Sequence, residues 1–319
     1  MAKSLAANLG AHWASIRDRD DVQRALKIIQ YALLALIVLY LVKKLTQVGW
    51  LEVANALPTT PWFYVFFLLR YLALPISELA IYEIVWEAPL VRHFFVFIRK
   101  RVYNFAVMGY SGEAFLTLWA RRRLNLPHKK ILIGVKDNNL LSAFASNAAT
   151  VALIVILAVT GGLSAGLHAF PGAGWLFALA FLSASALSVL VMVFRHKLMA
   201  LPEGVMPRLI GVHGARQALI ILLHAAMYAS ALPGAPLMAW LTFISLQLVL
   251  SRVPFLPNQD IVYLGAAMTL APIVGAPEHA VAGMLVAEAG LSQILNIFLF
   301  FATAHLARTD YKNAAVPAS

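Results

Sequence analysis

A polar interruption at residues 251–260 separates two apolar runs, 237–250 and 261–275. It contains two prolines, a cation, an anion and two amides: Pro254, Pro257, Arg252, Asp260, Asn258 and Gln259. Proline cannot continue the hydrogen-bond ladder of a helix, so backbone groups here lack helical partners. At membrane depth such groups persist only where they are buried in protein or line a wet cavity. The pattern predicts a broken helix near 251–263 whose polar groups bind a polar substrate.

A similar stretch lies in the first half of the chain, at residues 109–118. Gly109, Ser111 and Gly112 form a small turn, Glu113 follows, and an apolar helix start comes next. Residues 102–119 are too short and too interrupted for a regular span, so we interpret them as a re-entrant hairpin. Two such segments in the two halves are typical of a transporter built from an inverted repeat. Chance similarity between Gly- and Leu-rich stretches is the alternative.

The apolar run 61–86 carries three residues that are unusual inside a span, Arg70, Pro75 and Glu78. Arg70 and Glu78 are about two helical turns apart and therefore share a face. Pro75 between them predicts a kink or a break. The two charges either line a substrate path or form an ion pair that only holds helices together.

The last apolar run, 280–306, has a polar row. Glu288, Ser292 and Asn296 recur every four residues and so lie on one helix face. They either face a substrate path or make hydrogen bonds between helices, which are worth about 0.6 kcal/mol each.

The chemistry that these groups suit is recognition of a phospholipid head group. Arginine binds phosphate in a bidentate manner, and carboxylates pair with a cationic head group or neutralise the arginines of an empty site. The predicted substrate-binding residues are Arg70, Glu78, Glu113, Arg121, Arg252, Asn258, Asp260, Glu288 and Asn296.

No motif for catalysis or cofactor binding is present. The nine histidines lack metal-ligand spacing, and the absence of cysteine excludes disulfides and thiolate metal sites. Zinc-protease, nucleophile-elbow, Walker and dinucleotide fingerprints do not occur. We therefore expect no metal, no cofactor and no catalytic residue.

Composition gives the class of protein that must position these groups. The 319 residues are 61% hydrophobic and 12% charged, whereas soluble domains carry roughly 25% charged residues. The mean hydropathy is +0.79. We predict an all-α, polytopic membrane protein with an N-terminal cytoplasmic segment (1–24), one transmembrane domain (25–306) and a polar, disordered tail (307–319). About eight spans are expected, at 25–46, 61–86, 140–160, 174–194, 217–232, 237–250, 261–275 and 280–306, with a basic loop at 87–101.

The net charge of +11 would suggest nucleic acid in a soluble protein, but its distribution follows the positive-inside rule. With the N-terminus inside, inner segments hold 22 of the 25 Lys and Arg residues, and the outer loops hold none. We therefore expect both termini on the cytoplasmic side of a bacterial inner membrane. The inner face should favour anionic lipid.

The chain from about residue 25 to 306 resembles the membrane domain of the lysylphosphatidylglycerol synthetase/flippase (MprF) type. The resemblance rests on Gly109, Gly112 and Glu113 followed by the arginines 121–123, and on Pro254, Pro257, Asn258 and Asp260 before an apolar run. This chain lacks the proline before Gly112, and Asn258-Gln259 stands where the family has Gly-Gly. The resemblance implies lipid translocation between leaflets, by a member without the soluble aminoacyl-transferase domain.

Three functions follow as hypotheses. The first is a flippase-like lipid transporter for a phospholipid or related lipid, with an anionic phospholipid as the expected partner. The second is a membrane-embedded enzyme that modifies lipid head groups, which a metal cluster or an activated nucleophile would favour. The third is a non-catalytic assembly partner, which dry and packed broken helices would favour. A homodimer is compatible with the sequence, which does not specify it.

Overall fold

The structure is a computed structural model that describes residues 39, 42–43, 46–47, 49–106, 110–169, 174–202, 204–251 and 259–314. Every regular element in these ranges is a helix. The segment predicted at 1–24, most of the span predicted at 25–46 and part of the break, residues 252–258, lie outside them. Residues 307–314 continue the last helix, so the prediction of a disordered tail is wrong for that part.

Four helices are long and apolar enough to cross a membrane, and they make this a helical membrane protein. They are α4 (Pro61–Trp86), α7 (His128–Val159), α11 (Met206–Ala231) and α14 (Glu278–Ala314), whose apolar part is Glu278–Ala304. Two shorter apolar helices are Phe177–Val193, within α9 (Gly174–Val193), and α12 (Leu237–Leu250). Pro75 does not break α4, which continues through it.

The first interrupted segment is a helical hairpin. After a short 3-10 helix, η1 (Val91–His93), α5 (Phe94–Ala106) and α6 (Ser111–Arg123) pack against each other. Each has 13 residues, about 20 Å, which is less than the ~30 Å hydrocarbon core. The predicted hairpin at 102–119 is thus present but longer, and the basic loop predicted at 87–101 is wrong because residues 94–101 are helical.

Close contact in this hairpin depends on Gly112. A Cβ atom at Gly112 would lie 2.1 Å from the backbone oxygen of Lys100. The Gly112 amide also donates a 2.7 Å hydrogen bond to Asn104 Oδ1. The two helices therefore meet at a point where only glycine fits.

The second interrupted segment is a pair of short helices. α12 ends at Leu250 and α13 (Gln259–Thr269) follows, with a 3-10 turn, η2 (Ala271–Val274), after it. α12 and α13 are in contact. With 11 residues, about 17 Å, α13 is too short to cross the hydrocarbon core, so the full span predicted at 261–275 is wrong.

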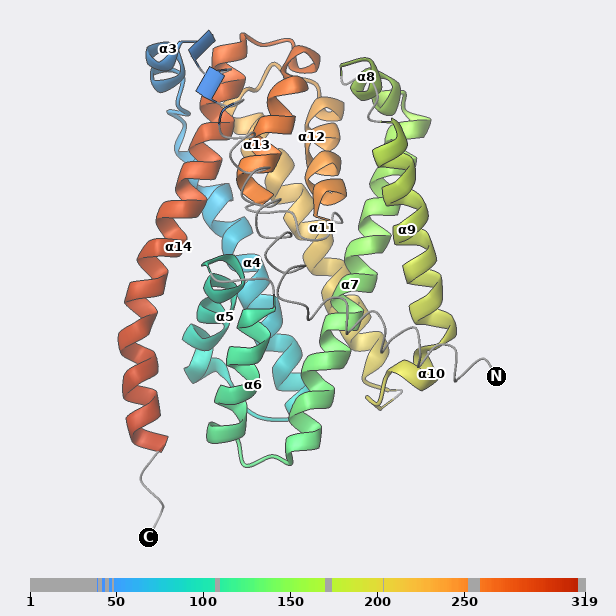
Figure 1. Cartoon of the computed structure of the whole chain (residues 1–319), viewed down its shortest axis with the longest axis vertical. Coiled ribbons are helices and arrows are strands. Elements are labelled where there is room, and N and C mark those ends of the chain that lie inside the picture. The colour runs from blue at the N-terminus through green and yellow to red at the C-terminus, as the bar shows by residue number, and fades with distance from the viewer. Residues whose placement is uncertain are drawn as a thin grey trace, which may run out of the picture.

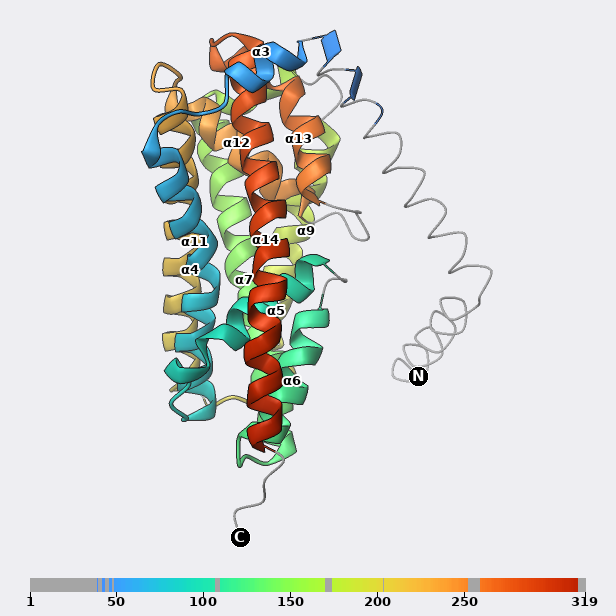
Figure 2. The same ribbon diagram turned by 90° about the vertical axis from the view of Figure 1, so that its left-hand side faces the viewer.

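The two pairs of short helices occupy opposite halves of the molecule. In Figures 1 and 2, α5 and α6 lie in the lower half and α12 and α13 in the upper half, while α4, α7, α11 and α14 run along the long axis. The small helices α3 (Trp50–Asn55) and α8 (Gly162–Ala169) lie at the upper end, and α10 (Arg195–Leu198) lies at the lower end. The two pairs of short helices therefore enter the bundle from opposite ends and approach each other in the middle.

Two of the long helices begin earlier than predicted. α7 starts at His128 rather than residue 140, and α11 starts at Met206 rather than residue 217. Their added turns are polar, and some of these polar groups have partners. The buried carboxylate of Asp137, for example, accepts hydrogen bonds from the amides of Ala200 (2.8 Å) and Leu201 (3.0 Å).

Candidate functional site

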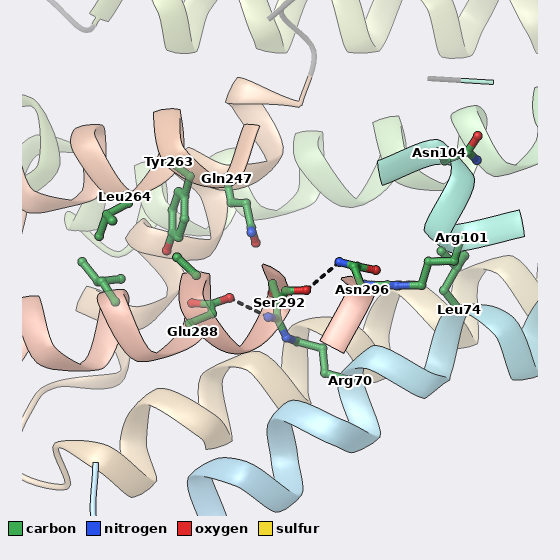
Figure 3. A pocket seen from close by; sticks show the side chains of 12 residues that line it. Arg70, Leu74, Arg101, Asn104, Gln247, Tyr263, Leu264, Glu288, Ser292 and Asn296 are labelled. Carbon is green, nitrogen blue, oxygen red and sulfur yellow. Dashed lines mark hydrogen bonds and ion pairs between the residues drawn. The ribbon is translucent and has the colours of Figure 1, made fainter. Parts of the chain in front are cut away.

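A cavity lies where the two pairs of short helices approach each other. Its volume is about 300 Å³, at the lower end of small-molecule sites and close to ten water molecules. Five helices line it through Arg70, Leu74, Arg101, Asn104, Gln247, Tyr263, Leu264, Leu285, Glu288, Ala289, Ser292 and Asn296. Figure 3 shows these side chains around one space.

One wall of the cavity is a buried ion pair. Arg70 Nη2 of α4 donates to Glu288 Oε1 of α14 at 2.5 Å, and these side chains are 15% and 7% exposed. Tyr228 of α11 donates to Glu288 Oε2 at 2.5 Å, and the Tyr228 and Tyr263 hydroxyls are 2.8 Å apart. These contacts hold the carboxylate on two sides and fix the direction of the arginine.

His224 of α11 contacts this ion pair. Arg70 Nη1 donates to His224 Nδ1 at 3.3 Å, and His224 Nε2 lies 3.2 Å from Glu288 Oε1. The imidazole is 1% exposed. Because an acceptor at Nδ1 carries no proton, the contact with Arg70 assigns the proton of a neutral ring to Nε2, facing Glu288.

The opposite wall comes from α5. Arg101 reaches toward Asn296 of α14 (Figure 3), and its guanidinium lies 4.0 Å from the centre of the Tyr71 ring. Tyr71 in turn donates to Asn296 Oδ1 at 2.7 Å. The side chain of Asn296 is held further by its hydrogen bond to the Ser292 carbonyl, at 2.7 Å. Arg101 is thus placed by an aromatic face and an amide.

The described lining contains two arginines. Arg70 and Arg101 contribute two guanidinium groups, and Glu288 is the one carboxylate among the lining residues that the structure describes. An anionic group with two or more acceptor oxygens would match the donor geometry of these two arginines.

A second buried polar cluster lies between α4 and the first hairpin. Lys100 of α5 binds Glu78 of α4 and also lies 3.1 Å from Glu113 Oε1 of α6. All three side chains are at most 14% exposed. The Lys100 ammonium also lies 5.9 Å from the centre of the Tyr82 ring. This cluster joins the hairpin to α4.

The predicted site residues fall into four groups. Arg70, Glu288 and Asn296 line the cavity, whereas Glu78 and Glu113 bind Lys100 instead. Arg70 and Glu78 therefore do not pair with each other. Arg70 pairs with Glu288, and Glu78 pairs with Lys100. Arg121 is exposed at the end of α6, 3.3 Å from His128. Arg252, Asn258 and the side chain of Asp260 lie outside the described residues.

Sequence reasoning missed several residues of these clusters. Lys100 and Arg101 were assigned to a loop, and His224, Tyr228 and Tyr263 were not singled out. A usable signal was present, because apolar residues flank Lys100 and Arg101 on both sides, from 94 to 98 and at 102 and 103. His224 is packed against Tyr228, with ring centres 4.5 Å apart, and belongs to the buried network rather than to a loop or interface.

Among the described residues, no three or more His, Asp or Glu side chains are grouped as metal ligands. What the arrangement can do is hold an anion between two guanidinium groups and offer it hydroxyl and amide donors.

Comparison with protein-family models, with curated proteins and with solved structures finds no match for this chain.

Proposed function

We propose that the protein moves an anionic phospholipid between the two leaflets of a membrane, with the head-group phosphate passing through the cavity between Arg70 and Arg101. The observation that carries the proposal is a polar cavity lined by guanidinium groups from two different helices, α4 and α5. A phosphate at the centre of a bilayer needs partners that replace water. Two guanidinium groups, a tyrosine hydroxyl and amides provide them here.

The position of the cavity supports movement across the membrane rather than binding at its surface. Glu288 and Asn296 lie in the central part of the apolar span Glu278–Ala304, and Arg70 lies ten residues into α4. A volume of about 300 Å³ suits a head group. The acyl chains would remain in the surrounding lipid, which removes the need to bury them in protein.

We further propose that the chain is an inverted repeat. Long helices flank a pair of short helices in each half, as α4 and α7 flank α5 and α6, and as α11 and α14 flank α12 and α13. The two pairs enter from opposite ends (Figure 2). Such halves exchange roles in transporters that open alternately to either side.

We place the basic end of the molecule on the cytoplasmic side of a bacterial inner membrane. Arg121, Lys129, Arg195 and Arg208 lie at the ends of α6, α7, α10 and α11 that share one end of the bundle (Figure 1). Clusters of basic residues face the cytoplasm in membrane proteins. We also propose a relationship to the lysylphosphatidylglycerol flippase family. It rests on the sequence motifs around Glu113 and Asp260.

An enzyme that modifies lipid head groups is the second candidate, favoured by the buried Arg70–Glu288–Tyr228 network. Mass spectrometry of lipids incubated with the pure protein distinguishes the two. A modified lipid identifies an enzyme, and unmodified lipid together with leaflet exchange identifies a transporter.

The test of transport is leaflet exchange in proteoliposomes that contain a fluorescent phosphatidylglycerol. Arg101→Gln should slow the exchange by about tenfold or more, since a charge-assisted hydrogen bond is worth about 1.5–3 kcal/mol. Arg208→Gln, at the exposed start of α11, is the matched control and should leave the rate unchanged. Equal rates for Arg101→Gln and the native chain would contradict the proposal.

A further inference from the structure

Polar residues of α4 recur at the same intervals in α11. The order in α4 is Pro61, Arg70, Glu78 and Tyr82, and the order in α11 is Pro207, Arg216, His224 and Tyr228. In both helices the arginine follows the proline by nine residues, Glu78 or His224 follows the arginine by eight, and the tyrosine comes four residues later. The two helices pack against each other. Arg70 contacts His224, which follows Arg216 by eight residues. Glu78, which follows Arg70 by eight, is close enough to Arg216 for their charges to interact.

The last long helix of each half repeats a polar row. α7 carries Asn138 and Ser142, and α14 carries Glu288 and Ser292; the second member of each pair follows the first by four positions. The contacts correspond as well. Tyr82 accepts a hydrogen bond from Asn138 at 3.2 Å, as Tyr228 binds Glu288 at 2.5 Å.

The short helices follow the same scheme. Lys100 of α5 precedes Glu113 of α6 by thirteen residues, and Gln247 of α12 precedes Asp260 of α13 by thirteen. Gln247 lines the cavity. Lys100 in the first half of the chain therefore corresponds to Gln247, a cavity-lining residue, in the second half.

The counterpart of the cavity is closed in this structure. Arg216 is 5% exposed, Lys100 is 2% exposed and His213 is fully buried. Arg216 Nη2 donates to Ser142 at 3.0 Å. Within the described residues, Arg216 Nε, both ring nitrogens of His213, Asn138 Oδ1 and Glu113 Oε2 are buried without a hydrogen-bond partner. Buried polar groups generally pair with protein or with water, so these five atoms can form further hydrogen bonds with water or with a polar ligand.

We propose that Arg216 and Lys100 form a second binding site for the phosphate of an anionic phospholipid, related to the cavity by the inverted repeat. In the present conformation Glu78 and Glu113 take the place of the phosphate at Lys100, as Glu288 does at Arg70. When the halves exchange conformations, the cavity beside Arg70 closes and the site beside Arg216 opens to the opposite side. The identity of the ligand rests on the proposed function, whereas the site rests on the correspondence of residues and contacts.

The chain contains no cysteine, so single cysteines report on each site without background. Ser292→Cys places a thiol at the cavity, and Ser142→Cys places one at the corresponding position beside Arg216. Ser183→Cys in α9, away from both, is the control. Each full-length variant is reconstituted into phosphatidylcholine vesicles with or without phosphatidylglycerol and treated with a membrane-impermeant maleimide on either side.

The expected result is reciprocal access. Ser292→Cys reacts from one side of the membrane and Ser142→Cys from the other. Phosphatidylglycerol slows both reactions by about tenfold where it fills roughly nine-tenths of the sites, and it leaves Ser183→Cys unchanged. Reaction of Ser142→Cys from the same side as Ser292→Cys, no reaction from either side, or indifference to phosphatidylglycerol would overturn the second site.

The outcome separates this inference from the proposed function. If phosphatidylglycerol protects both thiols but the protein exchanges no lipid, the second site is supported and the proposal of transport is contradicted. If the protein exchanges lipid but phosphatidylglycerol does not slow the labelling of Ser142→Cys, transport is supported and the second site is contradicted.

Discussion

Arg70 of α4 and Glu288 of α14 are 218 residues apart in the chain, and their side chains meet at 2.5 Å on the wall of a buried cavity. The pair links the first and last long helices of the described bundle. It also orients a guanidinium group toward a space that α5, α12 and α13 complete. The energetics of this pair give the first prediction.

Arg70→Gln alone should destabilise the fold by about 3–5 kcal/mol, because it leaves Glu288 buried without its cation. The double variant Arg70→Gln/Glu288→Gln should recover most of that loss, because two neutral amides replace two charges at similar volume. Unfolding in a detergent titration measures both. A double variant as unstable as the single one would show that the pair is not an energetic unit.

Lys100→Met should destabilise the fold by a similar ~3–5 kcal/mol, since Glu78 and Glu113 then lose a shared buried cation. The matched control is Lys129→Met, at the exposed start of α7, where a change within about 0.5 kcal/mol is expected. Thermal unfolding of the two purified variants compares them. Equal unfolding temperatures for the two variants would contradict a structural role for Lys100.

Gly112→Ala should loosen or prevent the packing of α5 on α6, because the new Cβ would lie 2.1 Å from the Lys100 carbonyl. The expected cost is about 1–3 kcal/mol or more, as for overpacked sites. Gly211→Ala in α11 meets nothing within 4 Å and should be neutral or stabilising by up to about 1 kcal/mol. Proteolysis between α5 and α6 measures the difference, and equal resistance of both variants would refute the close contact.

The sequence predicts some elements closely for a simple reason. α4 and α12 match their expected limits, and α9 differs by one residue, because apolar runs there begin and end at proline, glycine or charged residues. The helical hairpin around Glu113 and the short helices around the 251–260 break are also recognisable, since prolines, glycines and an acid mark them.

Other elements depend on partners that are distant in the chain. Residues 94–101 were assigned to a loop because cations in hydrocarbon are costly, yet Lys100 has Glu78 and Glu113 as partners and Arg101 lies on Tyr71. Hydropathy does not predict the early start of α7, because the charged residue Asp137 is stabilised by hydrogen bonds from backbone amides of another segment. Only the tertiary fold brings such partners together.

The most direct test of the account is leaflet exchange by the double variant Arg70→Gln/Glu288→Gln, which keeps the fold but removes the charges from one wall of the cavity. In proteoliposomes with fluorescent phosphatidylglycerol, exchange should fall by about tenfold to a hundredfold relative to the native chain, as expected when one charge-assisted phosphate contact is lost. A folded double variant that exchanges phosphatidylglycerol at the native rate would contradict the claim that this cavity carries the head group.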